Sequence, residues 1–498
     1  MFKPALLAVG AGAVLALAFP SLDWEGAAWV ALAPLVAMAV GRSPRAALGW
    51  GWLTGFTFFL LLLRWLDFTF RVYSAIPWPV TWLPTMLLAA YCGLYFGVFA
   101  GAISWVATGW GASAGLLVAP FVWVAVEWIR GLLMGGFPWG NLAYSQYRQL
   151  AVIQIAELAG ADGVSFLVLA INAALAACVL LPRRRALVAC GLAGALLAGS
   201  LVFGVWRLGE ARGPEVTVGI MQPAIEQPLK WSPEHASATL AIYAELTRAA
   251  ARQHPGLIVW PETASPTLLR QDPTLLAGLR EVSASFGVPI LVGSVDVGEG
   301  TPPDVRNTAF LLTERGIVGR YDKIHLVPFG EYVPLSGVIG FVRGWAEFIS
   351  ELTPGTRAVV FSGPPAPFGV VICYEGIFPA LVRRFAEGGA RFMVNMTNDA
   401  WFGRTSGPLQ HLAMYPFRAV EHRVAVVRAA NTGVSAFIAP TGEIVRSLGL
   451  FERGTLVQAV PLRTRQTLYT QIGAWLAYLS LAVSALALAA TGLRGLFR

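Results

Sequence analysis

The chain has 498 residues, of which 56% are hydrophobic and only 13% are charged. Soluble domains are usually about a quarter charged, so we expect much of this chain to lie in lipid. The formal charge of +8 would also suit nucleic acid, but the arginines cluster beside apolar runs, where membrane topology explains them. We therefore expect the lipid bilayer to be a partner and nucleic acid not to be one.

Candidate membrane spans come first along the chain, because a helix needs about 20 apolar residues to cross a bilayer. They lie at roughly 5–20, 26–41, 48–66, 81–107, 113–134, 161–181, 186–208 and 469–491. The first two are short, and the first also resembles a cleavable signal peptide, so retention and cleavage both stay open. The sequence thus predicts a transmembrane bundle of about seven spans at 1–210 and a transmembrane helix with a tail at 468–498.

Loop charges predict the orientation of these spans. With eight spans, most basic loop residues fall on one side: Lys3, Arg42, Arg45, Arg183, Arg184, Arg185, Arg494 and Arg498. The short loops on the other side hold fewer, such as Arg71 and Arg148. Cytoplasmic loops carry the excess of Lys and Arg, so both termini are predicted to be cytoplasmic. The region before the last span then lies on the far side, in the periplasm of a cell with two membranes.

Residues 213–465 have the composition of an ordinary α/β domain, in which short β-rich runs alternate with helical patterns. Strands are predicted in EVTVGIMQ, GLIVWPE, VPILVGSV, NTAFLLT, FGVVICYE, FMVNMTND and VSAFIAP. Helices are predicted in SATLAIYAELTRAAARQ, PALVRRFAEGG and PLQHLAMYPFRAVEHR. The fold class is therefore a polytopic α-helical membrane protein with an inserted, layered α/β domain whose active residues lie at strand ends.

Reactive side chains follow three of the apolar runs. Glu262 comes just after the strand in LIVWPETA, Lys323 lies in the loop GRYDKIHLVPFGEYVP beyond another strand, and Cys373 ends VVIC. Acyl transfer through a thioester needs such groups: a carboxylate to take the thiol proton, a cation to stabilise the oxyanion, and a sulfur to attack the carbonyl. A nearby lysine would favour the thiolate. Asn398 and Asp399 follow a fourth strand at the same expected edge, and we expect them to support the site.

Simpler interpretations of these residues stay open. A lone cysteine at a strand end is usually a small packing residue, Glu262 could cap a helix, and Lys323 could be a solvated loop charge. Spacing along the chain does not show that the three are close together. The other cysteines are in apolar runs, and no Cys/His spacing indicates zinc, so no metal site is expected.

Longer motifs around the three groups add a resemblance. WPET, YDKIHLVPFGEYVP and VICYEG resemble the Glu, Lys and Cys motifs of the nitrilase (carbon–nitrogen hydrolase) superfamily. With the membrane spans they resemble the apolipoprotein N-acyltransferase family, over essentially the whole chain. The resemblance includes EWIRGLLMGGFPWGNLAYSQ, MQPAIEQPLKW, NMTNDAWFG, GPLQHLAMYPFRAVEHR and RAANTGVSAFI. One departure is MQPAIEQ, because some members have a Gly-Asn pair after the glutamine, here Gln222.

This resemblance implies a nitrilase-like αββα sandwich and a set of roles. Cys373 would be the nucleophile, Glu262 the general base and Lys323 the stabiliser of the oxyanion. Supporting and substrate-binding positions would be Glu331, Glu375, Trp231, Tyr332, Tyr374, Asn398 and Trp401.

The activity that the resemblance implies is acyl transfer between membrane lipids. The donor would be a phospholipid, with the sn-1 chain of phosphatidylethanolamine transferred. The acceptor would be the α-amine of the diacylglyceryl-cysteine at the N-terminus of an apolipoprotein, in the final step of lipoprotein maturation. A cysteine thioester would be the intermediate and no cofactor would be needed. The implied location is the bacterial inner membrane, with the catalytic domain in the periplasm.

Two further segments carry expectations. Glu127 and Arg130 lie three apart in an apolar span, where charges are costly and usually paired or functional. We expect an ion pair that anchors the loop at 135–147, and a contact with lipid headgroups is the alternative. Residues 335–352 follow the Lys323 loop and hold three aromatic residues among three glycines. This segment is either a mobile arm that reaches the membrane or a packed helix.

Two rival functions also fit parts of the sequence. A membrane-tethered amidase or nitrilase would use the same triad with water, in a small polar pocket instead of an apolar cleft open to lipid. A receptor or transporter would need no reactive thiol and would carry polar residues along its spans. The few charges within the spans argue against transport.

Overall fold

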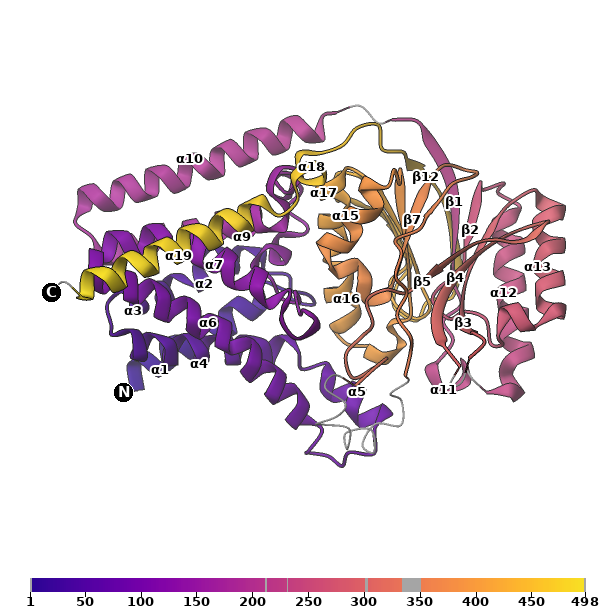
Figure 1. The fold of residues 1–498 in the computed structure, drawn as a ribbon, viewed down its shortest axis with the longest axis horizontal. Helices are drawn as coiled ribbons and strands as arrows, with labels where there is room; N and C mark the ends of the chain where they lie inside the picture. Colours follow the sequence, from indigo (N-terminus) through magenta and orange to yellow (C-terminus); the bar gives the residue numbers. More distant parts are fainter. Residues whose placement is uncertain (1, 211–212, 231, 301–302, 334–350, 497–498) are drawn as a thin grey trace. The chain divides into compact units, whose positions relative to one another are not determined.

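The computed structural model describes residues 2–210, 213–230, 232–300, 303–333 and 351–496 (Figure 1). Trp231 and nearly all of the 335–352 segment lie outside the described residues. Contacts divide the chain into two compact units. The helical unit comprises Met1–Phe68, Pro77–Glu210 and Ile472–Arg498, and the α/β unit comprises Thr69–Ile76 and Ala211–Gln471.

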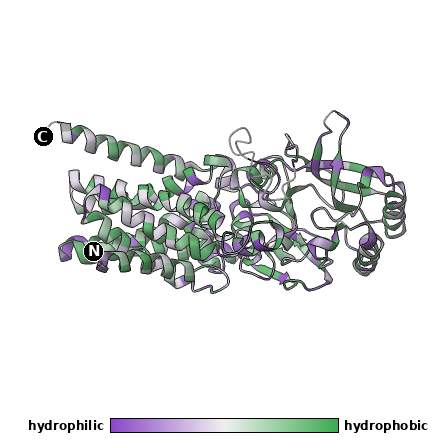
Figure 2. Ribbon diagram, turned by 90° about the horizontal axis from the view of Figure 1, so that it is seen from below, coloured by the Kyte–Doolittle hydropathy of each residue, from purple (hydrophilic) through white to green (hydrophobic). Residues whose placement is uncertain are grey.

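Apolar helices build the helical unit. Its α-helices are α1 (Phe2–Leu17), α2 (Ala28–Ala31), α3 (Ala33–Val40), α4 (Pro44–Leu62), α6 (Trp82–Trp110), α7 (Ala112–Arg130), α8 (Leu150–Ile153), α9 (Ala156–Leu180), α10 (Arg183–Leu208) and α19 (Trp475–Leu496). The short helices η1 (Glu25–Ala27), η2 (Leu133–Gly135) and η3 (Leu142–Gln146) lie between them, and α5 (Leu66–Tyr73) leads from this unit into the other. Hydrophobic residues dominate the long helices (Figure 2).

Six helices among the described residues are long and apolar enough to cross a membrane, namely α4, α6, α7, α9, α10 and α19. They coincide with the six longer predicted spans, so the helices expected there are present. The two short predicted spans correspond to shorter apolar helices, Lys3–Leu17 and Glu25–Val40. Each of these is below the length of about 20 residues that crosses a bilayer without tilt or thinning.

Small residues allow the helices α4 and α6 to pack closely. A Cβ added to Gly55 of α4 would lie 2.9 Å from the Cα of Gly93 of α6, and one at Gly51 would lie 3.0 Å from the Cα of Gly97. Such close approach is a usual source of helix–helix stability in lipid, where burial of apolar surface gives little driving force.

The predicted anchoring of the loop at 135–147 by Glu127 and Arg130 is confirmed. Arg130 donates hydrogen bonds to the carbonyl oxygens of Phe137 and Trp139 at 2.9 and 2.6 Å. Glu127 Oε1 accepts a hydrogen bond from the backbone N–H of Leu142 at 2.7 Å. The charges therefore act on the backbone of the loop itself, which differs from the simple ion pair that we expected.

Two six-stranded sheets form the α/β unit. One has the order β12-β1-β2-β3-β4-β5 and the other β11-β10-β9-β8-β7-β6. The strands are β1 (Glu215–Gln222), β2 (Leu257–Val259), β3 (Ile290–Val297), β4 (Val305–Thr313), β5 (Gly316–Asp322), β6 (Val360–Phe361), β7 (Phe368–Ile372), β8 (Phe392–Thr397), β9 (Ala425–Ala430), β10 (Ala436–Ile438), β11 (Ile444–Ser447) and β12 (Gly454–Pro461).

Helices cover the outer faces of the two sheets (Figure 1). On the first sheet lie α12 (Ala236–Ala251) and α13 (Pro273–Phe286), and on the second lie α15 (Pro379–Glu387) and α17 (Tyr415–His422). Between the sheets, β1 packs against β9. The α/β unit is thus a nitrilase-like αββα sandwich, as predicted. The other helices within the described residues of this unit are α11 (Gln227–Lys230), η4 (Pro233–His235), η5 (Leu269–Gln271), η7 (Cys373–Ile377), η8 (Asp399–Phe402), α16 (Gly407–Leu412) and α18 (Leu468–Ile472).

Several boundaries differ from the sequence-based prediction. The strands β2 and β7 end at Val259 and Ile372, so Glu262 and Cys373 lie in turns just beyond them. The helix predicted at 408–423 is two helices, because Pro416 lacks the backbone N–H that a continuous helix would need and lies instead in the first turn of α17. The strands β5, β6, β9, β11 and β12 and the helix α13 were not predicted.

Candidate active site

The strand directions bring the predicted reactive residues to matching edges. In the first sheet β1, β2 and β3 are parallel, and β5 has the same direction as β3 because both pair antiparallel with β4. Glu262 and Lys323 therefore leave this sheet at its carboxyl edge. In the second sheet β7, β8 and β9 are parallel, so Cys373, Asn398 and Asn431 leave it at one edge as well.

Glu262 joins the two sheets through its carboxylate. The side chain is buried, and its Oε2 accepts a hydrogen bond from the backbone N–H of Asn398 at 2.8 Å. Its Oε1 accepts from Asn307 Nδ2 at 2.8 Å and lies 3.3 Å from Lys323 Nζ. These contacts fix the carboxylate in one orientation between the strand ends, as a general base requires.

Lys323 lies between two carboxylates. Its Nζ is 2.7 Å from Glu331 Oε1 and 3.3 Å from Glu262 Oε1. Burial lowers the pKa of Lys323, but the charges of Glu331 and Glu262 outweigh that effect and raise its pKa above the ordinary value. Lys323 therefore stays an ammonium in the buried site, which suits a group that stabilises negative charge on a substrate oxygen.

Cys373 stands on a sharp turn after β7. Its backbone φ is +52°, in the left-handed region that residues with side chains rarely adopt. Tyr415 Oη donates a hydrogen bond to the Cys373 carbonyl oxygen at 3.0 Å, and Asn395 Nδ2 donates to the same oxygen at 3.4 Å. Side chains from α17 and β8 thus hold the turn through the Cys373 carbonyl oxygen, and these two bonds do not involve the thiol.

The surroundings of Cys373 disfavour the thiolate form of its side chain. Burial raises the pKa of Cys373 above its usual range, the charge of Glu262 raises it further, and Lys323 only partly opposes them. This outcome differs from the expectation that a nearby lysine would favour the thiolate. A thiol in this state needs a base at the moment of reaction, and Glu262 is close enough for its charge to be felt.

Glu375 holds the two reactive loops together. Its Oε2 accepts from the N–H of Ile372, next to the nucleophile. Its Oε1 accepts from Tyr321 Oη at 2.7 Å and from the N–H groups of Ile324 and His325 at 2.6 and 3.0 Å, just after Lys323. Burial raises the pKa of Glu375 to about 7 despite these donors.

Asp399 belongs to a buried polar group that also includes Arg428, His411 and Tyr415. Its Oδ2 accepts from Arg428 Nη2 at 2.6 Å, and its Oδ1 lies 3.0 Å from His411 Nδ1. Burial raises the pKa of Asp399, but Arg428, His411 and Thr397 together outweigh burial and lower this pKa to about 2. His411 Nε2 in turn lies 3.2 Å from the Tyr415 hydroxyl that holds the Cys373 turn.

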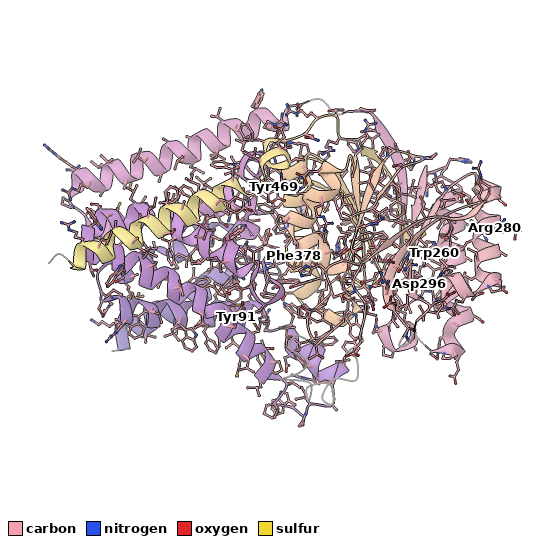
Figure 3. All side chains as sticks on the ribbon, viewed as in Figure 1. Tyr91, Trp260, Arg280, Asp296, Phe378 and Tyr469 are labelled. Atoms are coloured by element: carbon pink, nitrogen blue, oxygen red, sulfur yellow. The ribbon has the colours of Figure 1, made fainter. Side chains whose placement is uncertain are left out.

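The aromatic candidates lie around this site in different ways. The Tyr374 ring packs edge-on against Phe378, 5.0 Å between centroids, and Phe378 is labelled in Figure 3. The Trp401 ring packs on Tyr73 at 4.9 Å, and Thr69 Oγ1 donates to the Trp401 carbonyl oxygen at 2.9 Å.

Asn398 and Tyr332 complete the predicted set, apart from Trp231 outside the described residues. Besides its N–H bond to Glu262, Asn398 donates from Nδ2 to Gln227 Oε1 at 2.7 Å and accepts at Oδ1 from Asn431 Nδ2 at 3.0 Å. Tyr332 is only partly buried, and its carbonyl oxygen accepts from the N–H of Phe329 at 2.8 Å. Asn398 is thus part of the framework around Glu262.

Other polar residues in the site were missed by sequence reasoning. They are Lys230, Asn307, Asn395, His411, Tyr415 and Arg428. One signal could have found two of them, because Asn395 and Arg428 interrupt apolar runs, FMVNMT and AVVRAA, that form buried strands. A polar side chain in such a strand must be hydrogen-bonded, and polar partners imply a site nearby. Among the described residues, no group of three or more His, Cys, Asp or Glu could hold a metal ion.

Comparisons with known proteins show which family this chain belongs to. The apolipoprotein N-acyltransferase N-terminal domain matches residues 11–174, and the carbon–nitrogen hydrolase family matches residues 217–469. Apolipoprotein N-acyltransferase of Geobacter metallireducens is 37% identical over 94% of this chain and 91% of its own length. That of Gloeobacter violaceus is 32% identical over 97% of this chain and 93% of its own length.

Among solved structures, an amidase from Nesterenkonia sp. aligns with a TM-score of 0.38 and 22% identity, over 50% of this chain and 92% of its own. The family assignment does not depend on that alignment. It follows from the relatives above, which are more than 30% identical over nearly their whole length. The chain belongs to the apolipoprotein N-acyltransferase family.

Proposed function

We propose that this enzyme moves an acyl chain from a membrane phospholipid to the free α-amine of a diacylglyceryl-cysteine, through a thioester on Cys373. The observation that supports this most directly is the convergence of Glu262, Lys323 and Cys373 from separate strand ends. A base, a fixed cation and a thiol within reach of one another are what the two half-reactions need.

The first half-reaction would acylate the enzyme. Cys373 sulfur attacks the ester carbonyl carbon of the phospholipid while its proton passes to the Glu262 carboxylate. The ammonium of Lys323 stabilises the negative charge that develops on the carbonyl oxygen. The ester C–O bond then breaks, and the leaving lysophospholipid oxygen takes the proton back from Glu262. In keeping with the resemblance, we propose phosphatidylethanolamine as donor and its sn-1 chain as the chain moved.

In the second half-reaction the neutral amine attacks the thioester carbonyl carbon. The C–S bond breaks, an amide forms, and the amine proton passes through Glu262 to the sulfur. The cysteine is free again and no cofactor is consumed. Each half-reaction uses the same base and the same cation, so one rigid site serves both.

The test is acylation without an acceptor. Purified enzyme is incubated with phosphatidylethanolamine in mixed micelles, and the peptide that contains Cys373 is analysed by mass spectrometry. We expect one acyl chain on Cys373 together with free lysophospholipid. Cys373→Ala should give neither, whereas Cys92→Ala, Cys178→Ala and Cys190→Ala should acylate normally. Acylation that requires the acceptor amine would contradict the proposal.

Water is the competing acceptor if the enzyme is an amidase. In the same incubation, rapid release of free fatty acid with no stable adduct would favour the hydrolase alternative. A stable adduct that is discharged by a diacylglyceryl-cysteine peptide, and not by water, supports acyl transfer.

Orientation is a separate part of the proposal. Arg183, Arg184 and Arg185 at the start of α10 are all exposed, as a cytoplasmic basic cluster would be. We propose that the catalytic domain at 213–465 lies in the periplasm of a bacterium with two membranes. A reporter fused within this domain should be active on the periplasmic side, and one beside Arg184 on the cytoplasmic side. Both reporters on one side would overturn the orientation.

A further inference from the structure

Lys230 brings a second buried ammonium to the candidate site. It is the last residue of the short helix α11, and only 2% of its surface is exposed. Its Nζ donates to the Glu262 carbonyl oxygen at 2.9 Å and to Thr263 Oγ1 at 2.6 Å. These two bonds go to the main chain of Glu262 and to the side chain of its neighbour, whereas Lys323 and Asn307 contact the Glu262 carboxylate.

The turn that receives these bonds is strained. Thr263 has a φ of +43°, and a β-branched residue in the left-handed region is a genuine outlier. The neighbouring strand β3 approaches so closely that a Cβ at Gly293 would lie 2.7 Å from the Thr263 backbone nitrogen. Such a conformation persists only when its surroundings fix it, and Lys230 bonds the side chain and the preceding carbonyl at once.

The other end of α11 also contacts the surroundings of Glu262. Gln227 Oε1 accepts from Asn398 Nδ2 at 2.7 Å, and the Asn398 N–H donates to Glu262 Oε2. One short helix thus supports Glu262 at its main chain and, through Asn398, at its carboxylate.

We propose that Lys230 is a positioning residue for Glu262, which holds the left-handed turn at Thr263 and thereby aims the carboxylate at the Cys373 thiol. This inference rests on the proposed role of Glu262 as general base. A buried lysine that served only for packing would destabilise the fold, because burial disfavours the charged ammonium. The pKa of Lys230 is lowered to about 8 by burial, although the charge of Glu262 opposes the shift.

The test compares Lys230→Met, which fills similar space without donors, in two backgrounds. The second background is Thr263→Gly, since glycine adopts positive φ without strain. Single-turnover acylation of Cys373 by phosphatidylethanolamine in micelles is measured at increasing lipid concentration. In the wild-type background, Lys230→Met should lower the rate constant at saturating lipid by roughly 10- to 100-fold with the half-saturating concentration unchanged, because a misaimed base affects chemistry and not lipid binding.

In the Thr263→Gly background the same substitution should cost at most about threefold, since the relaxed turn no longer needs to be held. His254→Gly is the matched control, because His254 is an exposed residue with a φ of +50° at the end of the α12 segment. It should not reduce the cost of Lys230→Met. Equal costs in the wild-type and Thr263→Gly backgrounds, or wild-type acylation by Lys230→Met, would overturn the inference.

A second variant covers the case in which Lys230→Met does not fold. Thr263→Val keeps the β-branched shape and its strain but removes the acceptor oxygen, so acylation should slow severalfold, and an unchanged rate would overturn the inference. Glu262→Gln separates the two proposals. If Glu262→Gln still acylates Cys373, the proposed function fails. If it does not, and Lys230→Met acylates normally, only the role of Lys230 fails.

Discussion

The helical unit and the α/β unit both bury charged side chains, but they use them differently. In the helical unit Arg130 donates to backbone carbonyls, and Arg207 pairs with Glu157 at 2.7 Å. In the α/β unit Lys323 is shared by two carboxylates, next to a thiol on a strained turn. Arg207 also pairs with Glu210 at 2.6 Å, so each unit has a cation shared by two carboxylates. The difference is that Lys323 also acts on a thiol, whose pKa it lowers, whereas Arg130 and Arg207 satisfy backbone and carboxylate oxygens.

This difference teaches where chemistry is to be sought in a membrane protein. A buried charge in an apolar span is costly and is usually kept for structure or transport, so burial alone does not identify a catalytic group. Opposite charges that act on the same reactive side chain are a better indication of a catalytic group. Glu262 and Lys323 shift the pKa of Cys373 in opposite directions, and a small change in either would change the reactivity of the thiol.

Removing one cation from each unit should give the largest contrast. Lys323→Met should lower the rate of Cys373 acylation about 10²- to 10³-fold, the usual cost of losing one oxyanion-stabilising donor. Arg130→Met should instead lower thermal stability, because each orphaned carbonyl costs about 1–3 kcal/mol. Acylation per folded molecule and the melting temperature in detergent would separate the two effects. If Lys323→Met acylates normally and only its melting temperature falls, Lys323 would have the same structural role as Arg130, and the comparison would be wrong.

Glu262→Gln should separate the two influences of this carboxylate. Its negative charge raises the pKa of the Cys373 thiol, so its removal lowers that pKa and should speed reaction with a small alkylating reagent near pH 8. Acylation by phospholipid should slow instead, by about 10²- to 10⁴-fold, because the base is lost. Glu331→Gln is the matched control, since it removes a carboxylate from Lys323 and leaves Glu262 in place. Slower alkylation by Glu262→Gln would contradict the electrostatic account.

How far the sequence predicts this site depends on the kind of contact. Glu262 and Cys373 could be proposed because each follows a run of residues typical of a buried strand, and parallel strands bring such ends together. Lys323 follows β5, a half-exposed strand that was not predicted, so its motif was the stronger signal. The αββα architecture followed from the resemblance. The prediction that Lys323 would favour the thiolate was incomplete, because burial and the charge of Glu262 raise the pKa of Cys373 more than Lys323 lowers it. A sequence motif gives neither the burial of the thiol nor its distance from these charges.

Other parts of the site depend on pairing between distant segments. β12 pairs with β1 from Glu215↔Pro461 to Gln222↔Gly454. The hydrophobic pattern within each strand does not predict this register. Lys230 ends a four-residue helix, too short for any periodicity, and Arg428 looked unsuited to a buried strand. Arg428 is buried because Asn395 and Asp399 bind it, which only the fold reveals.

Glu375 and Asp399 are both fully buried, but their pKa values shift in opposite directions. The pKa of Glu375 is raised from 4.5 to about 7, so in this interval the folded state binds a proton that the unfolded state has lost. Stability should therefore fall as pH rises from 4.5 to 7, by up to about 3 kcal/mol. Asp399 stays ionised throughout, since its pKa is about 2.

Glu375→Gln cannot titrate, so it should flatten the dependence of the melting temperature on pH across this window. Asp399→Asn should lower the melting temperature without changing that slope, because it leaves Arg428 buried without its carboxylate. If wild type and Glu375→Gln give the same slope, Glu375 is not the group that titrates there.

The smallest effect is expected from Tyr415→Phe, which tests how the nucleophile turn is held. The substitution removes the hydroxyl that donates to the Cys373 carbonyl oxygen, while the ring stays packed against Gly376 and over Arg428. A single hydrogen bond of this kind contributes about 0.5–1.5 kcal/mol, and Asn395 still donates to the same oxygen. Acylation should therefore slow only about two- to tenfold. Tyr243→Phe is the control. Tyr243 is a buried tyrosine of α12, and its ring stacks on Trp260, which is labelled in Figure 3. Loss of the Tyr243 hydroxyl should not affect acylation. A loss from Tyr415→Phe as large as that from Lys323→Met would mean that the hydroxyl takes part in the chemistry and does not merely hold the turn.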